Sequence, residues 1–223
     1  MNTLLPHITL ETGQSPRHSI IWLHGLGADG EDFVSIAQEM SLPVAVRYIF
    51  PHAPQQPVTI NGGVVMRAWY DVIATSTGFQ QDAAGIRASQ AAIELLIAQE
   101  KQRGITAENI YLAGFSQGGA IALHTGLRHA QRMGGIIALS TYLPLAETLP
   151  HETSAAARNI PVFMAHGHDD PIIPFASGQA SSEILRGQGY RLEWHAYAMQ
   201  HSVCMEEVRD VAVWLTQRLN SAQ

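Results

Sequence analysis

Short apolar runs alternate with longer amphipathic segments along the whole chain. The apolar runs are rich in Ile, Val and aromatic residues and carry almost no charge, which is typical of strands covered on both faces. We expect strands at Ser19–Leu23, Val44–Phe50, Asn109–Phe115, Gly135–Ser140, Ile160–Ala165 and Tyr190–Tyr197. We expect helices at Glu31–Met40, Asp82–Arg103, Gln117–His129, Ser177–Arg186 and Cys204–Leu219. Strands that alternate with helices predict parallel βαβ units, and therefore a doubly wound, mostly parallel α/β sheet with helices on both faces.

One segment fits neither pattern. Val58–Gly78 contains the pair Gly62-Gly63 and shows no sustained period, so we expect an excursion loop over one edge of the sheet. This segment is compatible with a role as a lid, as a dimer contact or as both. The chain has no repeat or linker, and its 223 residues fit one domain that spans residues 1–223.

Composition narrows the class of protein. The formal net charge is -6 and Lys and Arg do not cluster, which argues against a nucleic-acid partner. A single cysteine, Cys204, leaves no internal disulfide and fits a reducing compartment, so we expect a cytoplasmic protein. Met1–Glu11 lacks the features of a signal peptide. The longest uncharged stretches are interrupted by Gly, Ser, Gln and His, and they do not predict a membrane span.

The first chemical candidate is a serine between a strand and a helix. Gly114-Phe115-Ser116-Gln117-Gly118 matches G-x-S-x-G, a pattern that chance alone would produce in on the order of one in ten chains of this composition. The context of the motif makes the match stronger evidence, because an expected strand precedes it and an expected helix follows it. This is the placement of the nucleophile elbow of α/β-hydrolases, where a sharp turn exposes the serine hydroxyl. We therefore expect Ser116 to be a nucleophile.

In that fold an acid and then a histidine follow the serine along the chain. Asp169 and Asp170 both follow the fifth expected strand, and we prefer Asp170 because it lies deeper in the loop and precedes the rigid Pro171. His201 lies just beyond the last expected strand and is our base. The rival His195 lies inside that strand, where a structural histidine is the better interpretation. The acid would fix the tautomer of the histidine and stabilise the imidazolium.

Two other arrangements compete with this triad. His166, His168, Asp169 and Asp170 superficially resemble a metal site, but they lie on a strand end and a loop without the i, i+4 helical spacing of paired ligands. We expect no metal and no cofactor. Cys204 lies three residues after His201 and suggests a Cys–His dyad. It has no oxyanion elbow of its own, so a buried structural thiol is the better interpretation.

The oxyanion hole of this fold takes one N–H from the residue after the nucleophile and a second from a loop after an early strand. His24-Gly25-Leu26-Gly27-Ala28-Asp29-Gly30 is such a loop. By position, the N–H groups of Leu26 and Gln117 are the candidate donors. His24 is expected to pack or to hydrogen-bond locally.

The sequence resembles the phospholipase/carboxylesterase family, which includes bacterial carboxylesterases and acyl-protein thioesterases. The resemblance is carried along the chain by Leu23–Asp29, Pro51–Pro54, Trp69–Asp71, Gly114–Gly119, Ala138–Ser140, His166-Gly167 with Asp170, and Met199 with His201. Thr59–Gly63 and Leu139–Tyr142 are closest to the bacterial carboxylesterases. The resemblance implies a compact hydrolase without a large cap domain, with Ser116, Asp170 and His201 as its triad and Leu26 and Gln117 as its oxyanion donors.

The resemblance also implies a substrate class. Family members cleave carboxylic esters of short to medium acyl chains, and some cleave thioesters or lysophospholipids. Met66, Trp69, Tyr142 and Ile172 match positions that line the acyl groove. Tyr142 replaces the Trp of family thioesterases, which bears on the acyl-chain preference. We therefore expect a serine carboxylesterase acting on a small-molecule substrate. A thioesterase or lysophospholipase with the same triad is the alternative, and a non-catalytic binding protein is the least favoured. A homodimer is compatible with this expectation.

Overall fold

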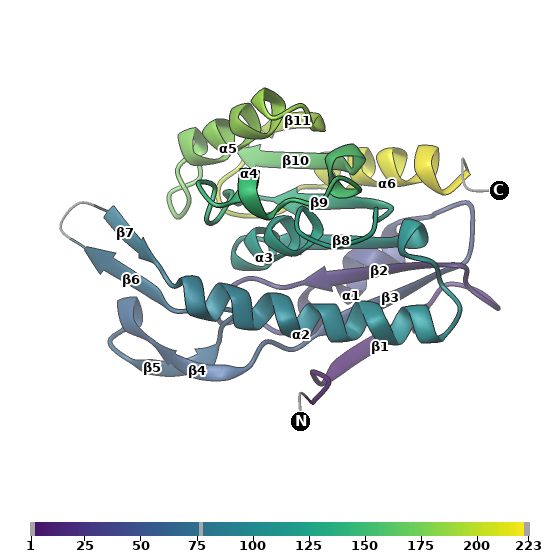
Figure 1. Ribbon diagram of the computed structural model, residues 1–223, viewed down its shortest axis with the longest axis horizontal. Coiled ribbons are helices and arrows are strands. Elements are labelled where there is room, and N and C mark those ends of the chain that lie inside the picture. Colours follow the sequence, from purple (N-terminus) through teal and green to yellow (C-terminus); the bar gives the residue numbers. More distant parts are fainter. Residues whose placement is uncertain (1–2, 76–77, 221–223) are drawn as a thin grey trace.

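The computed structural model describes residues 3–75 and 78–220. Its main feature is a seven-stranded sheet with the order β1-β3-β2-β8-β9-β10-β11 (Figure 1). Neighbouring strands are parallel, except that β1 is antiparallel to β3. The strands are β1 (His7–Glu11), β2 (His18–Leu23), β3 (Val46–Pro51), β8 (Ile110–Phe115), β9 (Gly135–Leu139), β10 (Pro161–Gly167) and β11 (Arg191–Tyr197). The predicted mostly parallel sheet is confirmed, and each of the six predicted strands is present.

The edge strand β1 is an addition to the predicted set. Ile8 and Leu10 are partly buried and pack against the core, whereas Thr9 between them is exposed. A strand of five residues that buries one face gives too short an alternation to be recognised from the sequence. Its antiparallel pairing with β3 extends the sheet by one strand at this edge.

Helices cover both faces of the sheet (Figure 1). The first face carries α2 (Ala83–Gln102), α3 (Gln117–Gly126), α4 (Leu149–Glu152) and α5 (Phe175–Gly187), and the second carries α1 (Val34–Glu39) and α6 (Met205–Leu219). Short 3-10 turns are η1 (Gly30–Phe33), η2 (Thr59–Asn61), η3 (Ala107–Asn109) and η4 (Ala157–Asn159). In β2, Ile21 and Leu23 pack under the first set of helices, and Ile20 and Trp22 pack under the second. Each such side chain contributes roughly 1.5–3 kcal/mol through burial.

The longest helix, α2, has the ends that its sequence predicts. The side chain of Asp82 accepts a hydrogen bond from the N–H of Gly85 at 2.9 Å, which caps the first turn. At the other end Gly104 adopts a φ of 93°, a left-handed conformation that glycine adopts without steric cost. Among helices of the described residues, none is both long and apolar enough to cross a membrane.

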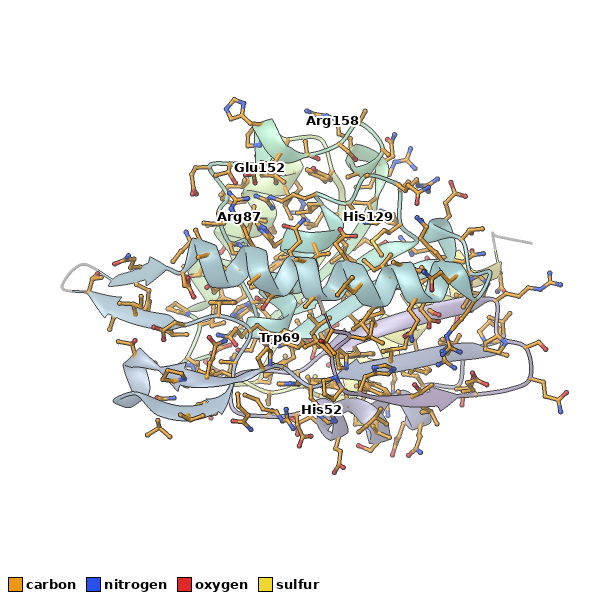
Figure 2. The ribbon with its side chains drawn as sticks, turned by 60° about the horizontal axis from the view of Figure 1, so that its bottom comes forward. His52, Trp69, Arg87, His129, Glu152 and Arg158 are labelled. Carbon is orange, nitrogen blue, oxygen red and sulfur yellow. The ribbon has the colours of Figure 1, made fainter. Side chains whose placement is uncertain are left out.

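The short helix α4 is fastened to its neighbours by a carboxylate. Glu152 accepts a hydrogen bond from Arg87 of α2 at 2.7 Å (Figure 2). It accepts a second one from Arg128, just beyond α3, at 2.6 Å. The Arg128 side chain is almost fully buried, and its pairing with Glu152 offsets the cost of burying the charge. The connection between β9 and β10 is thereby held against the first face of the sheet.

The prediction of an excursion loop at Val58–Gly78 was wrong in part. The chain forms one hairpin from β4 (Gln55–Val58) and β5 (Val64–Arg67) and a second from β6 (Val72–Thr75) and β7 (Gly78–Gln81). The first hairpin turns through Gly62 and Gly63, both at positive φ. Each strand has four residues and pairs only within its hairpin, so no long pattern marks it. Both hairpins project beyond the carboxyl ends of the central strands (Figure 1). Residues 76 and 77 lie outside the described residues.

Candidate active site

Ser116 lies in a sharp turn between β8 and α3. Its φ of 54° and ψ of -123° form a backbone conformation that side chains rarely adopt. A Cβ added at Gly114 would lie 2.4 Å from the carbonyl group of Gly118, and one at Gly118 would lie 2.3 Å from the carbonyl oxygen of Leu23. The two glycines therefore permit the strand, the helix and the end of β2 to meet. The predicted strand, turn and helix are confirmed, and the turn holds the serine at the carboxyl end of the sheet.

The structure brings Ser116, His201 and Asp170 into one hydrogen-bonded series. Nε2 of His201 is 2.9 Å from Oγ of Ser116, and Nδ1 is 2.7 Å from Oδ2 of Asp170. The loops that carry His201 and Asp170 are packed together, because a Cβ on Gly167 would lie 2.3 Å from the carbonyl oxygen of Met199. The three residues therefore come from separate loops, and close backbone packing holds the loops of Asp170 and His201 against each other.

The rivals of these residues lie elsewhere. Asp169 is exposed, and its N–H donates to the carbonyl of Met199 at 3.1 Å. The ring of His195 stacks on Phe163 with centroids 4.7 Å apart, on the second face of the sheet. Cys204 is the N-cap residue of α6 and is half-buried. None of these three side chains has a hydrogen bond to Ser116 in the described part of the chain.

Asp170 is held as an ionised acceptor. Its Oδ1 accepts the main-chain N–H groups of Ile172 at 2.8 Å and Ile173 at 2.9 Å, while Oδ2 accepts from His201. Burial alone raises the pKa of this carboxyl, but the hydrogen bonds from His201, Ile173 and Ile172 outweigh burial and hold the pKa below its ordinary value. An ionised Asp170 requires the proton of His201 to sit on Nδ1. Nε2 is then free to accept the proton of the Ser116 hydroxyl.

The loop after β2 lies beside the serine. A Cβ on Gly25 would be 3.5 Å from the Cβ of Ser116, so the main chain at Gly25 runs close to the serine. Gln117 is the first residue of α3, a position whose N–H has no partner within the helix. No hydrogen bond from the Leu26 N–H is found among the described residues. Leu26 directly follows Gly25 and Gln117 directly follows Ser116, and the roles of their N–H groups as oxyanion donors stay a prediction.

His24 sets the shape of this loop. Nε2 accepts the N–H of Ala53 at 3.1 Å, so the proton must be on Nδ1, which donates to the carbonyl of Gly25 at 2.6 Å. Burial lowers the pKa of His24 to about 4, and the ring is therefore neutral at physiological pH. The expectation that His24 hydrogen-bonds locally is confirmed. The bond to Gly25 fixes the peptide that precedes Leu26.

The side chain of Gln117 has a role that the sequence did not reveal. Oε1 accepts the N–H of Trp69 at 2.7 Å, and Nε2 donates to the carbonyl of Tyr70 at 2.7 Å. Trp69 in turn donates from its indole Nε1 to the carbonyl of His24 at 2.9 Å. Gln117 therefore connects α3 to the segment between the hairpins, and through Trp69 to the loop that follows β2.

We expect Gln117→Ala to loosen this connection while the main-chain donor of residue 117 stays in place. Two buried main-chain groups, at Trp69 and Tyr70, lose their partners, so the free energy of unfolding should fall by about 2–4 kcal/mol. Turnover of an ester should fall about tenfold as the loop at Leu26 gains freedom. Urea denaturation and steady-state kinetics measure both effects. Gln179→Ala, on the exposed side of α5, is the matched control; equal stability of the two variants would contradict the expectation.

The four predicted groove residues have different environments. Ile172 is 63% exposed, and Met66 is half-buried with its sulfur 3.7 Å from where a Cβ on Gly27 would lie. Tyr142 is also half-buried, and its hydroxyl lies 2.9 Å from that of Tyr70. Trp69 is only 1% exposed, and its indole N–H donates to the carbonyl of His24 in the loop after β2. Contact of these residues with an acyl chain stays a prediction. Because Trp69 is buried, we expect it to support the wall of the groove and not to line the groove itself.

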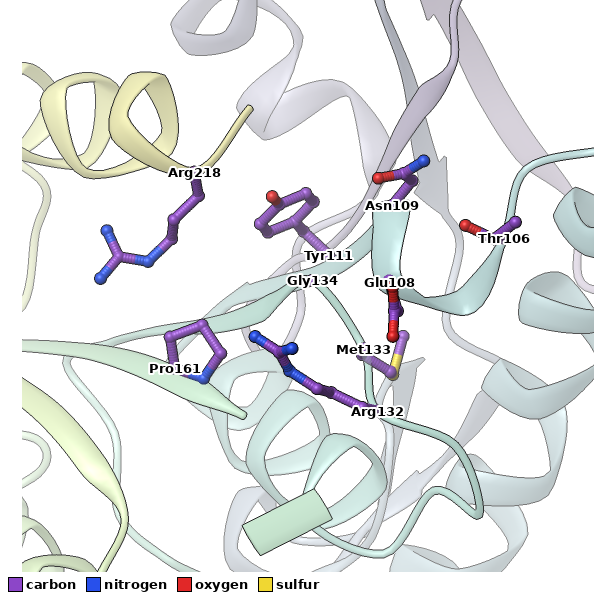
Figure 3. Close-up of a pocket in the computed structure, with 9 residues that line it drawn as sticks. All are labelled: Thr106, Glu108, Asn109, Tyr111, Arg132, Met133, Gly134, Pro161 and Arg218. Atoms are coloured by element: carbon purple, nitrogen blue, oxygen red, sulfur yellow. The ribbon is translucent and has the colours of Figure 1, made fainter. Parts of the chain in front are cut away.

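The described residues contain no group of three or more His, Cys, Asp and Glu side chains arranged to hold a metal ion. A polar cavity of about 410 Å³ lies at the amino ends of β8, β9 and β10, lined in part by Arg132, Arg218 and Tyr111 (Figure 3). Ser116 follows the carboxyl end of β8, so this cavity lies at the other end of the strands from the triad. It is therefore separate from the site around Ser116.

The sheet order, the strained serine turn and the histidine beyond the last strand define an α/β-hydrolase. The sequence model of the Phospholipase/Carboxylesterase family matches residues 7–219, and the chain belongs to this family. Acyl-protein thioesterase 1 of Gibberella zeae is 38% identical over 212 residues, covering 90% of each chain. The structure of Arabidopsis thaliana SOBER1 superposes with a TM-score of 0.84 at 31% identity, covering 91% of this chain and 99% of that one. Zea mays acyl-protein thioesterase 2 superposes with a TM-score of 0.85 at 28% identity, covering 96% and 99%.

Proposed function

We propose that this chain is a serine hydrolase that cleaves acyl thioesters, with Ser116 as nucleophile, His201 as base and Asp170 as the residue that orients it. The series of hydrogen bonds from Ser116 through His201 to Asp170 carries the proposal. The sequence alone favoured carboxylic esters. The thioesterase alternative is better supported, because the curated relatives at 34–38% identity are named acyl-protein thioesterases.

The proposed reaction has two acyl-transfer steps. Nε2 of His201 takes the proton of Ser116 as Oγ attacks the thioester carbonyl. The N–H groups of Leu26 and Gln117 stabilise the resulting oxyanion. The C–S bond then breaks, and His201 returns its proton to the leaving thiolate. Water repeats the sequence on the acyl-enzyme, so that the products are a carboxylic acid, a thiol and free Ser116.

A thiolate leaves more readily than an alkoxide, because a thiol has a pKa of about 8.5 and an alcohol is far less acidic. Cleavage of the C–S bond therefore depends less on proton donation by His201. An enzyme for thioesters therefore depends most on its nucleophile and oxyanion hole, and can accept a partly exposed histidine. The side chain of His201 is 16% exposed, whereas that of Asp170 is fully buried.

A covalent probe tests whether Ser116 is the nucleophile. A fluorophosphonate should label the wild-type protein, and Ser116→Ala should abolish the labelling. A wild-type protein that the fluorophosphonate does not label would overturn the hydrolase proposal and favour a non-catalytic binding protein.

The substrate class is tested with matched pairs of compounds. We expect kcat/KM for a thioester to exceed that for the oxygen ester of the same acyl chain by about tenfold or more, which corresponds to about 1.4 kcal/mol of preferential transition-state stabilisation. The pairs should span short to long acyl chains, so that chain length and leaving group are varied separately. If kcat/KM for the oxygen esters equals or exceeds that for the thioesters at every chain length, the chain is better described as a carboxylesterase.

A further inference from the structure

His166 is a buried histidine beneath the triad, and the proposed reaction does not use it. It lies near the end of β10, and its side chain is fully buried. Its Nε2 is 2.9 Å from the carbonyl oxygen of Ile173 and 3.3 Å from Oδ2 of Asp170. Oδ2 is the same oxygen that accepts the bond from His201. His166 has no catalytic role in the prediction from sequence: there it belongs to a metal-like cluster that is rejected, and to the positions that carry the family resemblance.

The surroundings of His166 determine where its proton lies. Nε2 faces a carbonyl oxygen and an ionised carboxylate, and neither can donate, so Nε2 must carry a proton. Nδ1 has no hydrogen-bond partner in the described part of the chain. It faces α5 so closely that a Cβ on Gly178 would lie 2.4 Å from it. A proton on Nδ1 would be buried without an acceptor, so the ring is neutral. Burial also lowers the pKa of His166.

Aromatic rings prevent His166 from turning. Trp194 stacks beside it with ring centroids 6.3 Å apart, and Phe175 meets it edge-on at 6.1 Å. The absence of a side chain at Gly178 leaves the space that Nδ1 occupies. His166 therefore presents one N–H in a fixed direction, toward the loop that carries Asp170.

Asp170 needs such a donor because its other contacts leave one motion open. Both main-chain N–H groups bind Oδ1, so the carboxylate can pivot about that oxygen and carry Oδ2 away from His201. We propose that His166 is a positioning residue whose Nε2–H, shared between Ile173 and Asp170, prevents this pivot and keeps Oδ2 on Nδ1 of His201. This inference rests on the triad proposed above, and it adds a fourth side chain to it.

The first test uses the unmodified protein and does not require hydrolysis. NMR of protein labelled with ¹⁵N in its histidine rings should show His166 neutral, with its proton on Nε2, from pH 5 to pH 8. The resonance is assigned by its loss in His166→Gln. A charged ring, or a proton on Nδ1, would overturn the inference.

The second test removes the donor. We expect His166→Phe and His166→Met to lower kcat by about 10- to 100-fold with little change in KM, because one hydrogen bond to a charged group is lost. The downfield proton resonance of His201 Nδ1–H should move upfield and exchange faster with water. His166→Gln keeps an N–H near the same point and should restore both. His168→Gln, two residues away and exposed, is the matched control.

The two proposals fail in different ways. A wild-type protein that neither hydrolyses the matched substrates nor reacts with a fluorophosphonate would remove the proposed function, while the His201 resonance can still be measured. An active wild type, with kcat and the His201 resonance unchanged in both His166→Phe and His166→Met, would overturn the positioning role alone. If His166→Phe does not fold, the less bulky His166→Met and the tautomer measurement decide the matter.

Discussion

Replacing Ser116 with glycine is expected to abolish hydrolysis and, at the same time, to stabilise the fold. The backbone at Ser116 is held at φ 54° and ψ -123°, where a Cβ is crowded and a glycine is not. Strain of this kind costs about 1–3 kcal/mol. The surrounding contacts maintain it: the N–H of Ser116 donates to the carbonyl of Leu139 at 2.8 Å, and its carbonyl accepts from Thr141 at 2.7 Å.

Ser116→Ala is the matched control, because it removes the hydroxyl but keeps the strained Cβ. Both variants should lower kcat by on the order of 10⁴- to 10⁶-fold, as expected when a catalytic serine is lost. Only glycine relieves the strain, and it pays about 0.5–1 kcal/mol in unfolded-chain entropy. Urea denaturation should therefore find Ser116→Gly more stable than Ser116→Ala by about 1 kcal/mol. If the glycine variant is the less stable of the two, the turn is not strained.

The turn at Ser116 could be predicted from the sequence because its serine and its two glycines lie in one short stretch of the chain. Gly114, Ser116 and Gly118 lie within one strand–turn–helix, and the close contacts they permit involve that turn and the end of β2. Asp170 and His201 followed from a chain-order rule, since parallel strands bring their carboxyl ends to one side of a sheet. The fold class followed from the alternation of buried strands and amphipathic helices for a similar reason, because each element shows its burial within its own few residues.

Contacts between distant segments could not be predicted in this way. Gln117 meets Trp69 and Tyr70 across more than forty residues, and the amide side chain of Gln117 has nothing in its own neighbourhood that marks it as a connector. His166 and Asp170 are near neighbours in sequence, yet their contact depends on the loop geometry after β10. The two hairpins escaped prediction because four-residue strands that pair only with each other carry no long hydrophobic period.

A buried glutamate on the other face of the sheet is expected to make stability depend on pH. Glu207 lies in the first turn of α6, and it is fully buried. Neither carboxylate oxygen has a hydrogen-bond partner of good geometry among the described residues. Burial, assisted by the nearby charge of Asp210, raises the pKa of Glu207 to about 8, and the N–H of Cys204 offsets only a small part of this.

The direction of the pH dependence follows from the protons bound. Between about pH 4.5 and pH 8 the folded state keeps the proton on Glu207, whereas the unfolded chain has released it. The folded state binds more protons in this range, so the free energy of unfolding falls as the pH rises. At 1.36 kcal/mol per pKa unit, the loss over this range is on the order of 5 kcal/mol. The stability that a protonated Glu207 permits is fully present only at the acidic end.

Glu207→Gln should remove this dependence, because the amide keeps the shape of the side chain and does not ionise. Near pH 5 the variant should be about as stable as the wild type, or slightly less stable, since a buried amide without partners still costs about 1–3 kcal/mol. Near pH 8.5 it should be the more stable protein by a few kcal/mol. Urea denaturation at both pH values measures the change, and Glu206→Gln, on the exposed side of the same turn, is the control. Parallel stability curves for the wild type and Glu207→Gln would mean that the carboxyl finds a partner or reaches water, and that α6 is less tightly packed at Glu207 than its burial indicates.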